Sequence, residues 1–250
     1  KALPQRAMLL RHLPAELSGM CLGYSGWSGA PIAQAQFHLP AKGLVELPEL
    51  GCVCSATEDG LVIAWSASTA KLSYVVSAST MVRAMAKLPN GHLATASTDG
   101  SLRVFDMKHS RQVCFAGRLK TVLRTSERPH IRDLVCTPSG HIIVLMGEAV
   151  RDHMSAVLEV WRVEGEELRF HASQRARGHT LRLLPDGELL VLGASPACLF
   201  HLGNMTWTNL TATMVDVAPA SHPKCFWAVS LWPHRVSLHY LRHNEDELYK

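Results

Sequence analysis

Short runs of alternating apolar and polar residues, separated by Gly, Pro, Asn and Asp, recur along most of the chain. Alternation with a period of two predicts half-buried β-strands, and this punctuation predicts tight turns between antiparallel neighbours. No segment keeps the 3.6-residue period of an amphipathic helix over a window of roughly 11–18 residues. The pattern therefore predicts an all-β chain built from antiparallel sheets.

An internal repeat is clearest within residues 45–106. Its two copies align at a Leu-Pro pair, an Asp-Gly turn and an aromatic residue, with one residue of slack at Leu50: Leu47-Pro48 with Leu88-Pro89, Asp59-Gly60 with Asp99-Gly100, and Trp65 with Phe105. The unit is about 40 residues long, a period typical of propeller-type arrays. Each unit is expected to contribute four strands.

Six copies of this unit can be placed, the first of them weak and the last without a fourth strand. Their approximate boundaries are 7–41, 42–79, 80–117, 129–174, 175–212 and 214–241. We therefore expect a single domain over residues 1–250, a β-propeller of about six four-stranded antiparallel blades. A seventh blade would follow if the sequence is an excerpt of a longer protein, or if a partner's strand completes the ring.

The turns and aromatic positions of these units resemble those of WD40-type β-propeller repeats. The turn matches are Pro89-Asn90-Gly91, Pro138-Ser139-Gly140, Pro185-Asp186-Gly187, Asp59-Gly60 and Asp99-Gly100, and the aromatic matches are Phe105-Asp106, Trp65 and Trp161. No copy carries the family's Trp-Asp pair, so the repeats are divergent. The resemblance implies a rigid ring that docks other protein subunits and needs no cofactor.

The composition suits a folded domain, with 47% hydrophobic and 18% charged residues in 250. A net charge of +4 permits an acidic partner without requiring one. Seven cysteines, an odd number, lie scattered and mostly inside apolar runs, which favours a reducing compartment over a disulfide framework. We expect an intracellular location, cytoplasmic or alternatively nuclear.

No apolar run approaches the roughly 18–20 residues of a membrane span. The chain begins at Lys1, and we interpret it as an excerpt of a longer protein.

Catalytic and metal-binding patterns are absent from the sequence. It contains no His-Glu-x-x-His, no Cys-x-x-Cys pair and no glycine-rich phosphate loop. Cys52 and Cys54 should share one face of a strand, where packing is a better explanation than metal binding. We predict no catalytic residue, no metal site and no small-molecule substrate.

Basic or titratable residues recur six positions before the turn prolines of four successive copies: Lys42, Arg83, Arg132 and His179. In a propeller the first strand of each blade lines the central channel. These residues would then make one channel mouth electropositive, suited to an acidic peptide, a phosphate or a nucleic-acid backbone. The alternative is that they are ordinary solvated residues at strand starts.

A second candidate surface is the basic link between the third and fourth copies, whose cations are Arg118, Lys120, Arg124 and Arg128. A solvated loop is the alternative, because no aromatic residues are interleaved with these cations. Trp232, in a predicted turn, is the best candidate for an exposed aromatic anchor.

Together these observations predict a non-catalytic propeller that acts as a protein–protein interaction scaffold within a larger intracellular complex. An alternative is a propeller that binds RNA or another polyanion through the basic channel mouth. An enzyme built on a propeller scaffold comes third.

Overall fold

The computed structural model describes residues 41–69, 71–116, 119–120, 130–147, 155–184, 186–193, 197–210, 213–219, 225–232 and 235–240. For residues 41–42, 115–116, 213, 215–219, 225–232 and 235–240 it describes the backbone alone. The chain divides between Phe115 and Ala116 into two compact units, and each unit is described separately below.

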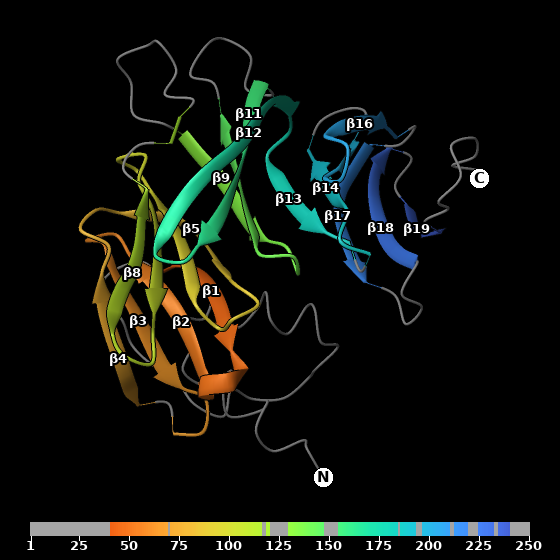
Figure 1. Ribbon diagram of the computed structural model, residues 1–250. Helices are drawn as coiled ribbons and strands as arrows, with labels where there is room; N and C mark the ends of the chain where they lie inside the picture. The colour runs from red at the N-terminus through yellow and green to blue at the C-terminus, as the bar shows by residue number, and fades with distance from the viewer. Residues whose placement is uncertain are drawn as a thin grey trace. The chain divides into compact units, whose positions relative to one another are not determined.

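The first unit contains two four-stranded antiparallel sheets (Figure 1). Sheet A consists, in spatial order, of β1 (Ala41–Leu47), β2 (Cys52–Thr57), β3 (Leu61–Ser66) and β4 (Leu72–Ser77), with a single 3₁₀ turn, η2 (Pro48–Leu50), after β1. Sheet B consists of β5 (Val82–Lys87), β6 (Leu93–Ser97), β7 (Leu102–Asp106) and β8 (Arg111–Ala116).

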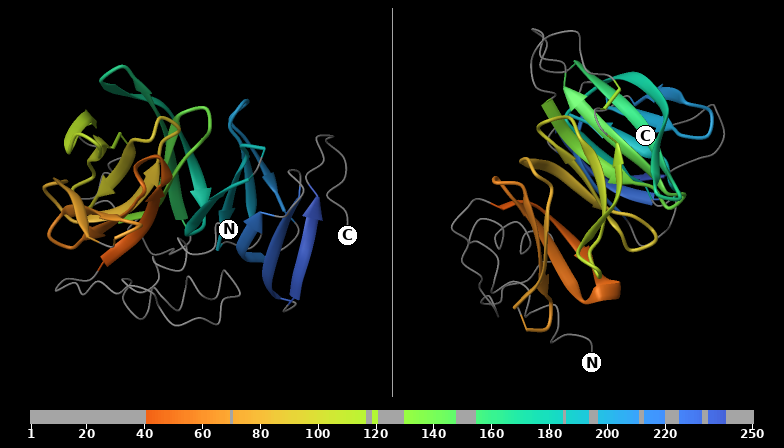
Figure 2. Two further views of the ribbon diagram at one scale, coloured as in Figure 1. Left: turned by 90° about the horizontal axis from the view of Figure 1, so that it is seen from below. Right: turned by 60° about the vertical axis from the view of Figure 1, so that its left-hand side comes forward.

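The second unit contains three antiparallel sheets whose strands also follow chain order. Sheet C consists of β9 (His130–Cys136), β10 (His141–Gly147), β11 (Ser155–Glu164) and β12 (Glu167–Arg177). Sheet D consists of β13 (Thr180–Leu183), β14 (Leu189–Leu192), β15 (Cys198–His201) and β16 (Thr206–Asn209). Sheet E has three strands among the described residues, shown in blue in Figure 2: β17 (Thr213–Pro219), β18 (Cys225–Trp232) and β19 (Arg235–Tyr240).

One turn recurs between the first and second strands of sheets A to D. Its glycine adopts positive φ, a conformation that side chains disfavour, and donates its N–H to the carbonyl three residues earlier. The four glycines are Gly51, Gly91, Gly140 and Gly187, with φ of 59°, 83°, 84° and 90°. The corresponding acceptors are Pro48, Leu88, Thr137 and Leu184. The structural unit of repetition is therefore this turn with its two flanking strands.

Buried side chains join each sheet to the next one within a unit. One cluster combines Ala56 and Ala64 of sheet A with Leu93 and Phe105 of sheet B. In the second unit, Leu158 and Val160 of sheet C pack with Leu189 and Phe200 of sheet D, and Leu192 of sheet D packs with Met214 of sheet E. Central strands are buried on both faces: every residue of β2, β6 and β14 is buried. The core is therefore a series of sheet-on-sheet layers.

The predicted all-β class and its four-stranded antiparallel sheets are confirmed, whereas the first predicted copy, 7–41, lies outside the described residues except for Ala41, which begins β1. Two details differ from expectation. The recurring turn aligns Glu49, not Pro48, with Pro89, because Gly51 and Gly91 hold the same position. In addition, β12 includes residues 175–177, which the sequence had placed in the fifth copy.

Candidate interaction surfaces

Arg83 and Arg132 occupy the same structural position, a β-bulge in the first strand of their sheets. The strand register skips Arg83 in β5 and Arg132 in β9. In β1 the skipped residue is Gly43, whereas Lys42 pairs regularly with Ala56. The expected equivalence of Lys42 with the two arginines is therefore wrong by one residue, because the first turn is offset at Glu49.

Within the second unit, Arg132 contributes to the contact between two sheets. Its guanidinium donates a hydrogen bond to the carbonyl oxygen of Gly178 and lies directly against Gly147, where an added Cβ would collide with it. His179 is exposed, and its backbone N–H donates to the Leu192 carbonyl. Arg132 of the predicted basic set thus joins β9 to the connection between β12 and β13.

Asp133, the next residue of β9, strengthens this junction. One carboxylate oxygen accepts the N–H of Leu181 on β13 at 2.8 Å, and the other accepts the N–H of Leu134 at 2.8 Å. Burial raises the pKa of Asp133, although these hydrogen bonds and the nearby Arg182 charge oppose the shift. The role of Asp133 could not be predicted from the sequence, because it depends on which strand lies beside β9.

The remaining predicted residues are not brought together by the described structure. Arg83 is exposed in the first unit, and Lys120 is exposed in the second. Arg118, Arg124 and Arg128 lie outside the described residues, as do the side chains of Lys42 and Trp232. Trp232 itself is the last residue of β18 and not part of a turn.

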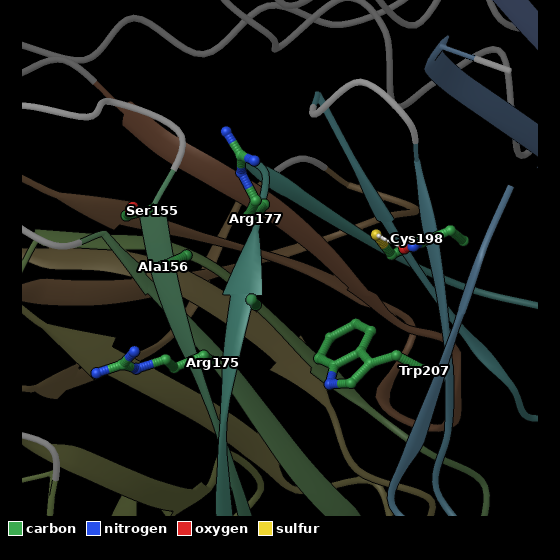
Figure 3. Close-up of a pocket in the computed structure, with 8 residues that line it drawn as sticks. Ser155, Ala156, Arg175, Arg177, Cys198 and Trp207 are labelled. Atoms are coloured by element: carbon green, nitrogen blue, oxygen red, sulfur yellow. Dashed lines mark hydrogen bonds between the residues drawn. The ribbon is translucent and has the colours of Figure 1, made fainter. Parts of the chain in front are cut away.

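A groove of about 540 Å³ in the second unit was not predicted from the sequence (Figure 3). It separates the outer strands of sheet C from those of sheet D. Ala156 of β11 and Ala176 of β12 form one wall, whereas Cys198 of β15 and Trp207 of β16 form the other. Both alanines are buried in the cluster shared with Phe200. Their small side chains leave open the space that Leu158 and Val160 fill further along the same interface.

Two arginines of β12 border this groove, but their side chains point in different directions. In Figure 3 the side chain of Arg177 points upward and that of Arg175 points to the left, and neither points toward Trp207. The charge of Arg177 also reaches Cys198: burial raises the pKa of this thiol, and Arg177 partly offsets the rise. The Cys198 Sγ–H donates to Asn209 Oδ1 at 3.3 Å. Cys198 is thus a partly buried, hydrogen-bonded thiol without the depressed pKa of a nucleophile.

A further polar set in sheet D joins an acid, a histidine and a hydroxyl. His201 Nδ1 lies 2.6 Å from Glu188 Oε1, and Nε2 lies 2.8 Å from Thr208 Oγ1. Because a carboxylate only accepts, Nδ1 carries the proton that it donates to Glu188, while Nε2 pairs with the Thr208 hydroxyl. Both ring nitrogens are thereby occupied, and the histidine links the turn before β14 to β16. Sequence analysis had found no such grouping, since the residues become neighbours only through strand pairing.

Among the residues that the structure describes, no group of three or more His, Cys, Asp or Glu side chains could hold a metal ion. No described helix is both long and apolar enough to cross a membrane. Comparisons with known proteins add no relative: no protein-family model matches this sequence, and no curated protein matches it significantly.

Proposed function

We propose that this protein is a divergent WD40-like β-propeller that acts as a non-catalytic platform for protein partners. The observation that carries the proposal is the repeated sheet-on-sheet packing. Consecutive four-stranded sheets share apolar clusters, A with B in the first unit and C with D in the second. In the second unit Asp133 also joins β9 to β13, and Arg132 joins β9 to Gly178 in the connection before β13. Successive propeller blades require this combination of contacts.

A platform role also accounts for the distribution of exposed side chains. Among the described residues, the exposed large apolar side chains are Leu72 and Val75 on β4 and Phe170 on β12, the fourth strands of their sheets. In such a scaffold the fourth strand of each sheet lies at the outer surface, where partners can dock by shape and charge. The same strands of sheets C and D border the groove described above.

The test is affinity capture with the tagged chain from a lysate of its source organism, followed by identification of the retained proteins. A platform should retain defined proteins in moderate salt after nuclease treatment. The polyanion alternative predicts instead that retention is lost with nuclease and that binding to heparin or RNA falls steeply with salt, because phosphate contacts release counterions. Failure to retain any defined protein would refute the platform.

A further inference from the structure

We propose that a cluster of three basic side chains on sheet C binds a phosphate group, carried by a phosphorylated side chain of a protein partner. The three are His141 of β10, Arg162 of β11 and His171 of β12. The proposal rests on the platform function above and assigns one docking site to it.

Strand pairing brings these side chains together. His141 and Arg162 are direct partners across β10 and β11, so they project from the same face of the sheet. On the same face, two residues further along each strand, Ile143 and Val160 belong to the apolar cluster shared with sheet D. His171 is the extra residue of a β-bulge in β12, and its ring centroid lies 6.0 Å from that of His141. A bulge can redirect a side chain in this way.

The turn before β10 holds the His141 ring in place. Its Nδ1 lies 2.9 Å from Ser139 Oγ, which lies 2.9 Å from Thr137 Oγ1. Thr137 is 1% exposed and accepts the backbone N–H of His141 at 3.0 Å, so the chain of contacts is anchored in the core. Because Nδ1 is engaged, Nε2 is the ring nitrogen that can meet a ligand. A ring held in this way loses little conformational entropy on binding.

The electrostatics of the cluster favour an anion. Burial lowers the pKa of His141, and the positive charges of Arg162 and His171 lower it further. The described charges that shift this histidine are thus both positive. An anion bound between the three groups would relieve their repulsion and favour the charged form of His141.

The nearby carboxylates do not neutralise Arg162. Glu164 and Glu167 both pair with Arg169, at 2.9 Å and 3.5 Å. Arg162 is exposed, and within the part of the chain that the structure describes it makes no hydrogen bond or ion pair. Its guanidinium is therefore open to a ligand.

A phosphate monoester matches this set of donors better than a carboxylate does. It carries nearly two negative charges at neutral pH and offers three acceptor oxygens, so one guanidinium and two imidazoles can each meet an oxygen. A nucleic-acid backbone requires a series of cations, whereas this is a single compact cluster. The chemistry therefore favours a phosphorylated side chain.

The experiment uses the whole chain with ¹³C-labelled histidine, in which His141→Gln and His171→Gln identify the two ring resonances. The probe is the peptide acetyl-Gly-phosphoserine-Gly-amide, titrated to low-millimolar concentration. Ligand controls are the same peptide with serine or with glutamate, inorganic phosphate, and a short single-stranded RNA. Both resonances should move with the phosphopeptide, much less with the glutamate peptide and not with the serine peptide.

Two protein variants test whether the cluster acts as a site. Arg162→Gln should weaken phosphopeptide binding about 5-fold, the upper range for an exposed ion pair. Arg175→Gln removes the same charge from β12 outside the cluster and should leave binding unchanged. The other histidine resonances report whether each variant is folded.

Four results would overturn the proposal. They are stationary His141 and His171 resonances, equal responses to the phosphoserine and glutamate peptides, equal losses in Arg162→Gln and Arg175→Gln, and tighter binding of inorganic phosphate than of the phosphopeptide. The last would assign the cluster to free phosphate. A response to RNA without one to the phosphopeptide would favour the polyanion alternative instead.

Capture from a lysate with and without phosphatase treatment separates this proposal from the platform function. Loss of one retained protein after phosphatase treatment, and also in Arg162→Gln, supports the phosphate site. If neither change alters the retained proteins, the cluster is not the docking site, although the platform stands. If no defined protein is retained at all, the platform itself is refuted, whatever the phosphopeptide shows.

Discussion

Gly60 closes the turn between β2 and β3, and it is the position where one added methyl group should be felt most in sheet A. Its φ is +86°, and its N–H donates to the Thr57 carbonyl. A Cβ at this position would lie 2.7 Å from the carbonyl oxygen of Thr80 and 2.8 Å from its nitrogen. Thr80 belongs to the connection from sheet A to sheet B, and its backbone cannot swing aside as a flexible side chain could.

The cost of Gly60→Ala has two parts. A side chain at positive φ costs about 1–2 kcal/mol, and forcing a well-packed backbone apart adds about 1–3 kcal/mol. Gly91→Ala isolates the first part, because Gly91 has nearly the same φ, +83°, and no atom within 4 Å of its added Cβ. Gly60→Ala should therefore destabilise the protein by about 1–3 kcal/mol more than Gly91→Ala.

Urea unfolding of the unmodified protein and both variants, followed by circular dichroism, measures this difference. The slope of the free energy with urea should stay constant while the midpoint falls further for Gly60→Ala. Equal midpoints for the two variants would refute the argument, since they would show that the Gly60–Thr80 approach does not constrain the connection between sheets A and B.

Three further predictions concern buried polar groups and thiols. Burial raises the pKa of Asp133, so the folded state takes up a proton before the unfolded chain does as the pH falls. The unmodified protein should therefore gain stability relative to Asp133→Asn between pH 7 and about pH 4. Urea midpoints that show a relative loss would contradict this. Glu159 is fully buried and accepts the indole N–H of Trp161 at 2.8 Å and the backbone N–H of Lys120 at 3.2 Å. Glu159→Ala should therefore cost about 2–4 kcal/mol, whereas Glu159→Gln, which keeps an amide oxygen as acceptor, should cost clearly less; equal unfolding midpoints would count against these bonds. Burial raises the pKa of Cys54 to about 12, so iodoacetamide should label the partly exposed Cys198 before Cys54 in the folded protein. Peptide mass spectrometry measures the order, and earlier labelling of Cys54 would be the contrary result.

Strand positions could be predicted from the sequence because the signals are local. Alternating apolar residues and turn glycines act over a few neighbours, and they predict strands at 92–97, 141–146 and 189–192. The strands β6, β10 and β14 lie within one residue of these bounds. Cys52 and Cys54 do share one buried face, as strand alternation requires. The errors arose where the local signal was ambiguous: at Glu49, one extra residue before the turn glycine shifts the alignment.

The candidate groove could not be predicted, because it depends on which faces meet. Ala156 and Ala176 are ordinary strand residues in the sequence, and only the long β11–β12 hairpin brings them opposite Trp207. Arg175 and Arg177 lie two residues apart on β12, and in Figure 3 neither side chain points toward Trp207.

Local chemistry in the chain thus decides the all-β class, the turn glycines and the four-strand unit, since backbone conformation at each position depends on near neighbours. Tertiary structure alone decides what the basic residues do. It pairs Arg132 with the carbonyl of Gly178 and Asp133 with the backbone N–H of Leu181 on β13. The physical reason is that burial, desolvation and charge pairing depend on neighbours brought from distant parts of the chain, which no local pattern specifies.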